Sequence, residues 1–138
     1  MRSVPVVLAL LLVGCASQRG VPSLTTKSTP CTQNISQDTI VFDTTQVDRK
    51  PEIISGPEIR YPRELVRQHI SGRVVLALVV SANGQPELRS IRVLKSDDYQ
   101  FTAAAESYLR GAQFLPGCRQ GSAVRVRVAV PIDFKIVR

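Results

Sequence analysis

The sequence predicts an α+β domain in which a small antiparallel sheet of three strands is packed by two helices, in the order helix, strand, strand, helix, strand. Two observations carry this prediction. Apolar residues alternate with period two over residues 72–80 and again over residues 124–134, which is typical of strands. Between these runs, residues 101–109 carry an apolar stripe with helical spacing. The 138 residues are enough for one domain.

The first helix is predicted to open at Pro62, since proline is favoured at the first helical position, and to end near Ser71-Gly72. The first strand follows over residues 72–80. Its even-numbered residues are apolar, and its odd-numbered residues from 75 onward are apolar as well. We therefore expect this strand to be covered on both faces.

Asn83-Gly84 is a strong hairpin signal and separates the first strand from a second one predicted over residues 86–96. The apolar parity shifts between Leu88 and Ile91. We expect a β-bulge near Arg89-Ser90 to absorb that shift.

The second helix is predicted to run to about Ala112 behind the N-cap candidates Asp97 and Asp98. The last strand carries Pro131, which cannot donate to a ladder and so belongs on an edge or at a bulge. We expect Leu76 and Leu109 to lie between the helix and the sheet.

Composition excludes wholesale disorder, because 43% of the residues are hydrophobic and 21% are charged. The formal net charge of +7 suits an anionic neighbour such as nucleic acid, lipid headgroups or an acidic surface. Composition does not choose among these.

The N-terminus has the layout of a signal peptide, with one cation followed by ten residues without a polar side chain and then small residues. Leu12-Val13-Gly14-Cys15 resembles a bacterial lipobox. That resemblance implies cleavage after residues 1–14 and lipidation of Cys15, and Ala16 after the Cys favours the outer membrane. An ordinary signal peptide with a coincidental Cys is the alternative. In either case export excludes nucleic acid as a partner.

Residues 15–50 are thin in apolar side chains and contain Pro22 and Pro30, which predicts a flexible, lipid-anchored tether to a domain over residues 51–138. Within the tether, residues 39–42 are a candidate short strand. Cys31 and Cys118 form an even pair in an oxidising compartment and could form a disulfide, or stay as two unpaired thiols.

No residue set points to catalysis. His69 is the only histidine and sits at a predicted helix end, while adjacent Asp97 and Asp98 favour a cap over a carboxylate pair. Cys118 lacks the spacing of a metal ligand. We therefore expect no enzyme activity, no catalytic residue, no cofactor and no metal.

A series of short motifs resembles the C-terminal domain of TonB-family proteins over residues 51–138. Each motif is weak alone, but together they keep the family's order and spacing. They are Tyr61-Pro62, Gly72-Arg73-Val74-Val75, Asn83-Gly84, Val93-Leu94-Lys95-Ser96, Ala104-Ala105, Phe114-Leu115-Pro116, Gly121 and Val130-Pro131-Ile132-Asp133-Phe134.

The resemblance implies a periplasmic domain that captures an extended segment of an outer-membrane transporter by adding a strand to the edge of its last strand. The family often places a partner-contacting Gln three residues before its Tyr; this chain has Glu58 there. The implied partner-binding residues are Glu58, Tyr61, Pro62, Ala123, Val124, Arg125, Val126, Arg127, Val128, Ala129 and Val130. From the alternation itself, Arg125 and Arg127 are expected on a solvated face of an edge strand.

A TonB energy transducer carries an inner-membrane helix and a long Pro-rich spacer, and neither is visible in this sequence. We therefore expect a lipid-anchored, periplasm-facing binding module with a family role in transmembrane transport. Its expected partners are an outer-membrane or envelope protein segment, the membrane through the lipid, and a second copy of the chain in a homodimer. Two alternatives are a structural lipoprotein that contacts cell-wall or lipid polyanions, and an atypical transducer working with a separate membrane subunit.

Overall fold

The computed structural model describes residues 31–33 and 39–136. The predicted signal peptide, Cys15 and the first half of the tether lie outside these residues. The principal elements are α1 (Arg63–Arg67), β4 (Gly72–Val80), β5 (Arg92–Ser96), α2 (Tyr99–Gly111) and β8 (Ser122–Phe134). The minor ones are β1 (Thr32–Gln33), β2 (Val41–Asp43), β3 (Glu52–Ser55), the 3-10 helix η2 (Leu88–Ser90), β6 (Gln113–Leu115) and β7 (Gly117–Arg119).

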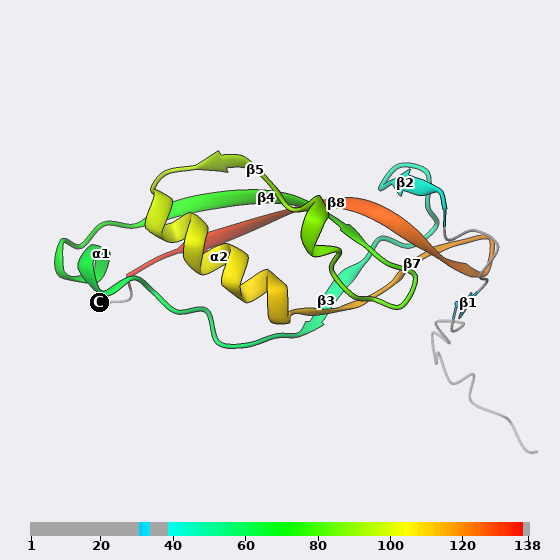
Figure 1. The fold of residues 1–138 in the computed structure, drawn as a ribbon, viewed down its shortest axis with the longest axis horizontal. Helices are drawn as coiled ribbons and strands as arrows, with labels where there is room; N and C mark the ends of the chain where they lie inside the picture. The colour runs from blue at the N-terminus through cyan, green and yellow to red at the C-terminus, as the bar shows by residue number, and fades with distance from the viewer. Residues whose placement is uncertain (1–30, 34–38, 137–138) are drawn as a thin grey trace, which may run out of the picture.

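The three principal strands form an antiparallel sheet in the order β8-β4-β5, with β4 in the centre. The long strands β4 and β8 pair from Gly72↔Phe134 to Val80↔Val126. Figure 1 shows them side by side, with α2 along one face of the sheet. The predicted α+β class and the order α1, β4, β5, α2, β8 are confirmed.

The core lies between α2 and the inner face of the sheet. Asp98 caps α2 by accepting a hydrogen bond from the Gln100 N–H at 2.7 Å. Leu76 and Leu109 are fully buried, as predicted. Their buried neighbours follow the predicted stripe and the predicted alternation: Val74, Leu78, Val80, Phe101, Ala105, Val124, Val126, Val128, Ile132 and Phe134.

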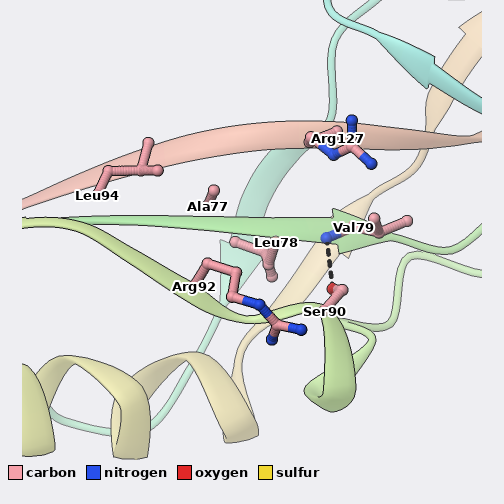
Figure 2. A pocket seen from close by; sticks show the side chains of 7 residues that line it. All are labelled: Ala77, Leu78, Val79, Ser90, Arg92, Leu94 and Arg127. Atoms are coloured by element: carbon pink, nitrogen blue, oxygen red, sulfur yellow. Dashed lines mark hydrogen bonds between the residues drawn. The ribbon is translucent and has the colours of Figure 1, made fainter.

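The outer face of β4 is not covered as the sequence led us to expect. Val79 is buried, but Val75 and Ala77 are only half-buried. Among the described residues no second layer covers this face, and a hollow of about 490 Å³ opens over Ala77 and Val79 (Figure 2). Apolar side chains also occur on a face that is only partly covered, so the apolar residues of β4 could not tell a covered outer face from a partly covered one.

The strand after the Asn83-Gly84 turn is shorter than predicted. Residues 88–90 form η2 rather than a bulged strand, and β5 begins only at Arg92. The parity shift that we assigned to a bulge near Arg89-Ser90 is thus absorbed by a 3-10 turn. A register irregularity does occur, but later, where Val75 pairs with Lys95 and Leu76 with Val93, so that Leu94 is the extra residue.

The turn itself needs glycine. Gly84 has φ +78°, and a Cβ there would lie 2.0 Å from the carbonyl oxygen of Phe114. The Phe114 N–H in turn donates to the Gly84 carbonyl at 2.9 Å. This contact joins the end of β4 to β6, far away in sequence.

At the end opposite to α1, the minor strands β1, β2 and β7 extend the sheet through β8, so that it becomes mixed rather than purely antiparallel (Figure 1). The strands β3 and β6 form a separate two-stranded sheet. β3 pairs with β6, β7 forms a hairpin with β8, and both β1 and β2 run parallel to β8. Residues 39–50, which we assigned to the tether, therefore carry a strand of the domain, and the boundary expected at Pro51 falls inside ordered chain. Among the described residues, no helix is long and apolar enough to cross a membrane.

Candidate strand-docking edge

The two sides of β8 are used differently, and the ladder decides which residues face which side. The Val79 N–H donates to Ser90 Oγ at 2.8 Å (Figure 2) and the Glu87 N–H donates to the Val79 carbonyl at 2.9 Å, so the backbone of Val79 faces away from β8. Its partner is Arg127. Along an antiparallel ladder, hydrogen-bonded residue pairs alternate with pairs that are not hydrogen-bonded to each other. The backbone groups of Arg127, Ala129, Pro131 and Asp133 therefore point away from β4. We call that side of β8 the outer edge.

Pro131 fits this parity. It pairs with Val75 and has no N–H, and at an outward position it removes no bond to β4. The sequence prediction that Pro131 belongs on an edge agrees with this placement.

The beginning of the outer edge is already occupied by the chain itself. β1 pairs in parallel with Ser122 and Ala123, and β2 pairs Val41, Phe42 and Asp43 with residues 125–127. The predicted open edge over Ala123–Val130 is therefore wrong for residues 123–127. The only indication in the sequence that the tether pairs with β8 is the candidate strand at residues 39–42, because the rest of the tether is polar.

From Val128 onward the outer edge borders a hollow of about 470 Å³. Its floor is apolar, with Val128 and Phe114 buried and Val130 half-buried. Ala129 and Pro131 are exposed. The opposite wall comes from the segment that leads into β3, and the remaining lining residues are Thr44, Lys50, Pro51, Glu52 and Ile53.

The two arginines of the predicted docking strand have different surroundings. Arg125 forms a double hydrogen bond to the Glu87 carboxylate at 2.6 and 2.7 Å, and only 22% of its side chain is exposed. The prediction of a solvated face is wrong for Arg125. The prediction agrees with Arg127, whose side chain is 61% exposed and whose guanidinium lies 4.0 Å from the Asp43 carboxylate.

The other predicted contact residues lie elsewhere. Tyr61 packs edge-on against Phe101 and Phe134, at centroid distances of 5.5 and 5.6 Å, and its hydroxyl donates to the Ile70 carbonyl at 2.6 Å. Pro62 is the N-cap residue of α1. Both lie at the α1 end of the molecule, while residues 123–127 lie at the end with β1, β2 and β7 (Figure 1).

Glu58 is exposed and lines a hollow of about 330 Å³ beside α2, together with Arg60 and Tyr108. The structure therefore does not bring Glu58, Tyr61 and Pro62 to the outer edge beside residues 128–130.

At the far end of β8, Arg73 donates to the carboxylate of Asp133, with one hydrogen bond of 2.9 Å. This hydrogen bonding lowers the pKa of Asp133 and raises the pKa of Arg73. The pair closes the outer face of the sheet at the end where β4 begins.

Cys31 and Cys118 are joined by a disulfide, with their Cα atoms 5.9 Å apart. The bridge links the residue before β1 to β7. Sequence reasoning had left this pair open between a bridge and two free thiols. Over the described residues, no group of three or more His, Cys, Asp or Glu side chains is arranged to hold a metal ion.

Comparisons with known proteins agree with this architecture. Residues 57–136 match the family model described as the Gram-negative bacterial TonB protein C-terminal. The solution NMR structure of the Pseudomonas aeruginosa TonB CTD is similar in fold, with a TM-score of 0.54 and 22% identity over 70% of this chain and 94% of that chain. No curated protein matches the chain. Because the family model spans more than half of the sequence, the chain belongs to the TonB C-terminal family.

Proposed function

We propose that this chain is a lipid-anchored binding module of the cell envelope that captures an extended segment of an envelope protein by strand addition to the outer edge of β8. The partner we favour is an outer-membrane transporter, so that the module serves transmembrane transport without being an enzyme. Membership of the TonB C-terminal family supports a binding role facing the periplasm. Lipidation at Cys15 remains a prediction from the sequence.

The observation that carries the proposal is the combination of outward backbone groups and adjoining space at residues 128–131. An edge strand offers unpaired N–H and C=O groups that bind an extended segment with little demand on its sequence. The hollow beside Val128–Val130 gives the side chains of that segment an apolar floor. We therefore place the docking site there, shifted toward the C-terminal half of the span that the family resemblance implied.

The test uses a photo-reactive residue in place of Ala129 in the full chain, expressed in the envelope. Irradiation should cross-link it to an outer-membrane protein, and the same residue in place of Ser107, on the exposed side of α2, should not. Equal cross-linking from both positions, or none from Ala129, would contradict the docking site. Metabolic labelling with a palmitate analogue should mark the wild type and not Cys15→Ala.

A second candidate function is contact with cell-wall or lipid polyanions through the outer face of the sheet. The observation that favours it is the hollow in Figure 2, where exposed Arg92 and Arg127 flank the small side chain of Ala77. Salt separates the two candidates. Strand pairing should change little between about 0.05 and 0.5 M salt, whereas a polyanion contact should weaken steeply because the charges are screened.

A further inference from the structure

The strand β2 covers residues 125–127 of the outer edge and lies outside the residues that the family model matches. The family model begins at residue 57, while β1, β2 and Cys31 all precede it. β2 runs parallel to β8, with Phe42 opposite Val126. β2 thus lies outside the residues that the family model matches, and it occupies part of the edge on which the proposed function depends.

β2 is held by one apolar anchor. Phe42 is only 8% exposed, belongs to the core cluster and lies under the Arg119 guanidinium at 4.7 Å from the ring centroid. Its neighbours contribute less, since Ile40 is 55% exposed and the Asp43 side chain, which faces Arg127 at 4.0 Å, is 64% exposed. A three-residue edge strand with a single buried side chain belongs to the least stable part of a fold.

This segment is held in place on both sides, by a disulfide before it and by hydrogen bonds after it. Before it, the disulfide ties Cys31 to β7 and the Thr32 N–H donates to the Gly121 carbonyl at 3.0 Å. After it, the N–H groups of Asp48 and Arg49 donate to the Cys118 carbonyl at 2.8 and 3.1 Å. A tethered strand has a high effective concentration at its site, so a free partner with the same contacts is outcompeted until the tether or the anchor is weakened.

We propose that β2 is an internal occupant of the docking edge and stands in for a partner strand. The partner it models is an extended segment parallel to β8, with a large apolar side chain at the place of Phe42 and an acidic one at the place of Asp43, beside Arg127. Release of β2 lengthens the available edge from residues 128–133 to residues 125–133, while β1 still covers residues 122 and 123. This inference rests on the proposed function, because it assumes that the outer edge is where partners dock.

The first test is peptide complementation. The probe is a fluorescein-labelled peptide with the sequence of residues 39–46, and the control peptide carries Asp at the place of Phe42. Phe42→Ser in the full chain, held in detergent, should bind the probe at least tenfold more tightly than the oxidised wild type, and should not bind the control peptide. The matched variant Ile40→Ser, which removes an exposed side chain, should behave like the wild type.

A folded Phe42→Ser that binds the probe no better than the wild type would overturn the proposal. So would a dimer that forms in Phe42→Ser and excludes the probe, because the edge would then belong to a second copy of the chain.

The second test needs no substitution. Dithiothreitol reduces the bridge by thiol–disulfide exchange, which leaves two cysteine thiols and the cyclic oxidised dithiol. Amide exchange should then accelerate at least tenfold at Arg127, whose N–H faces β2, and not at Val128, whose N–H faces β4. Unchanged exchange at Arg127, or equal acceleration at both amides, would count against an occupant held by the bridge.

The two proposals fail separately. If the Ala129 position cross-links to an envelope protein but the peptide does not bind Phe42→Ser, only the internal occupant is lost. If the peptide binds but the photo-reactive residue at position 129 cross-links to no envelope protein, β2 can still be replaced by the peptide, and only the proposed function is lost.

Discussion

The inner face of the sheet and the outer edge of β8 are built from the same thirteen-residue strand but are stabilised by different groups. On the inner face, side chains such as Val126 and Phe134 are buried against α2 and the rest of the core. On the outer edge, the available groups are backbone atoms of residues such as Ala129, and the side chains there are exposed. Stability and the proposed binding therefore depend on different atoms of one strand, and substitutions should separate them.

The largest effect should come from the inner face. Leu76→Ala and Leu109→Ala each remove a fully buried side chain between β4 and α2. Each should lower the free energy of unfolding by about 2–5 kcal/mol, through lost burial and the cavity left behind. Urea denaturation measures this, with Leu94→Ala as the control, since Leu94 is 61% exposed and should change stability by less than about 0.5 kcal/mol.

The second-largest loss of stability should come from removing the disulfide. Cys31→Ser combined with Cys118→Ser opens a link between residues 87 positions apart, which restores entropy to the unfolded chain. The free energy of unfolding should fall by about 2–4 kcal/mol, and α2 should still form. Thermal melting followed by circular dichroism tests this. Reduction of the wild type should reproduce the shift, and an identical melting curve in both redox states would contradict it.

The outer edge should respond in binding rather than in stability. Ala129→Pro removes an outward N–H at a position with the same parity as the native Pro131, so unfolding should change by less than about 1 kcal/mol. Capture of the envelope partner should fall at least tenfold. Ala129→Ser keeps the N–H and is the control. Normal capture by a folded Ala129→Pro would argue against strand addition.

The two arginines should differ although they are two residues apart. Arg125→Ala leaves Glu87 half-buried without its partner and should cost about 1 kcal/mol of stability, whereas exposed Arg127→Ala should cost less than that. Parallel urea titrations would show the difference. Equal effects would mean that the Arg125–Glu87 pair is no stronger than an ordinary surface pair.

The smallest effect should lie at the end of the outer edge. The pKa of Asp133 is lowered in the folded state, so its contribution to stability is present above the usual Asp pKa of about 3.9 and is lost as the pH falls through the lowered value. Wild type should therefore be slightly more stable than Asp133→Asn near pH 6, and the two should converge once the pH falls below the lowered pKa of Asp133. A constant difference between the two proteins down to the lowest pH at which both stay folded would contradict this.

The fold class, the order of the principal elements and the residues of the inner face could all be predicted from local patterns of residues. Period-two and helical spacing identify which side chains must leave water, and that requirement is local enough to read from residues such as Leu76, Leu109 and Asp98. The sequence also indicated the family and the pair Cys31 and Cys118, but not whether the two cysteines form a disulfide.

The way in which the edge of β8 is used could be seen only in the folded chain. Whether the backbone of Ala123 or Ala129 is free depends on which distant segment pairs with it, and a ladder places few demands on side chains. The same is true of Tyr61, whose ring packs into the core through residues from α2 and β8. Pairing between backbones leaves little trace in composition, so the occupancy of the edge by β2 had to come from the fold.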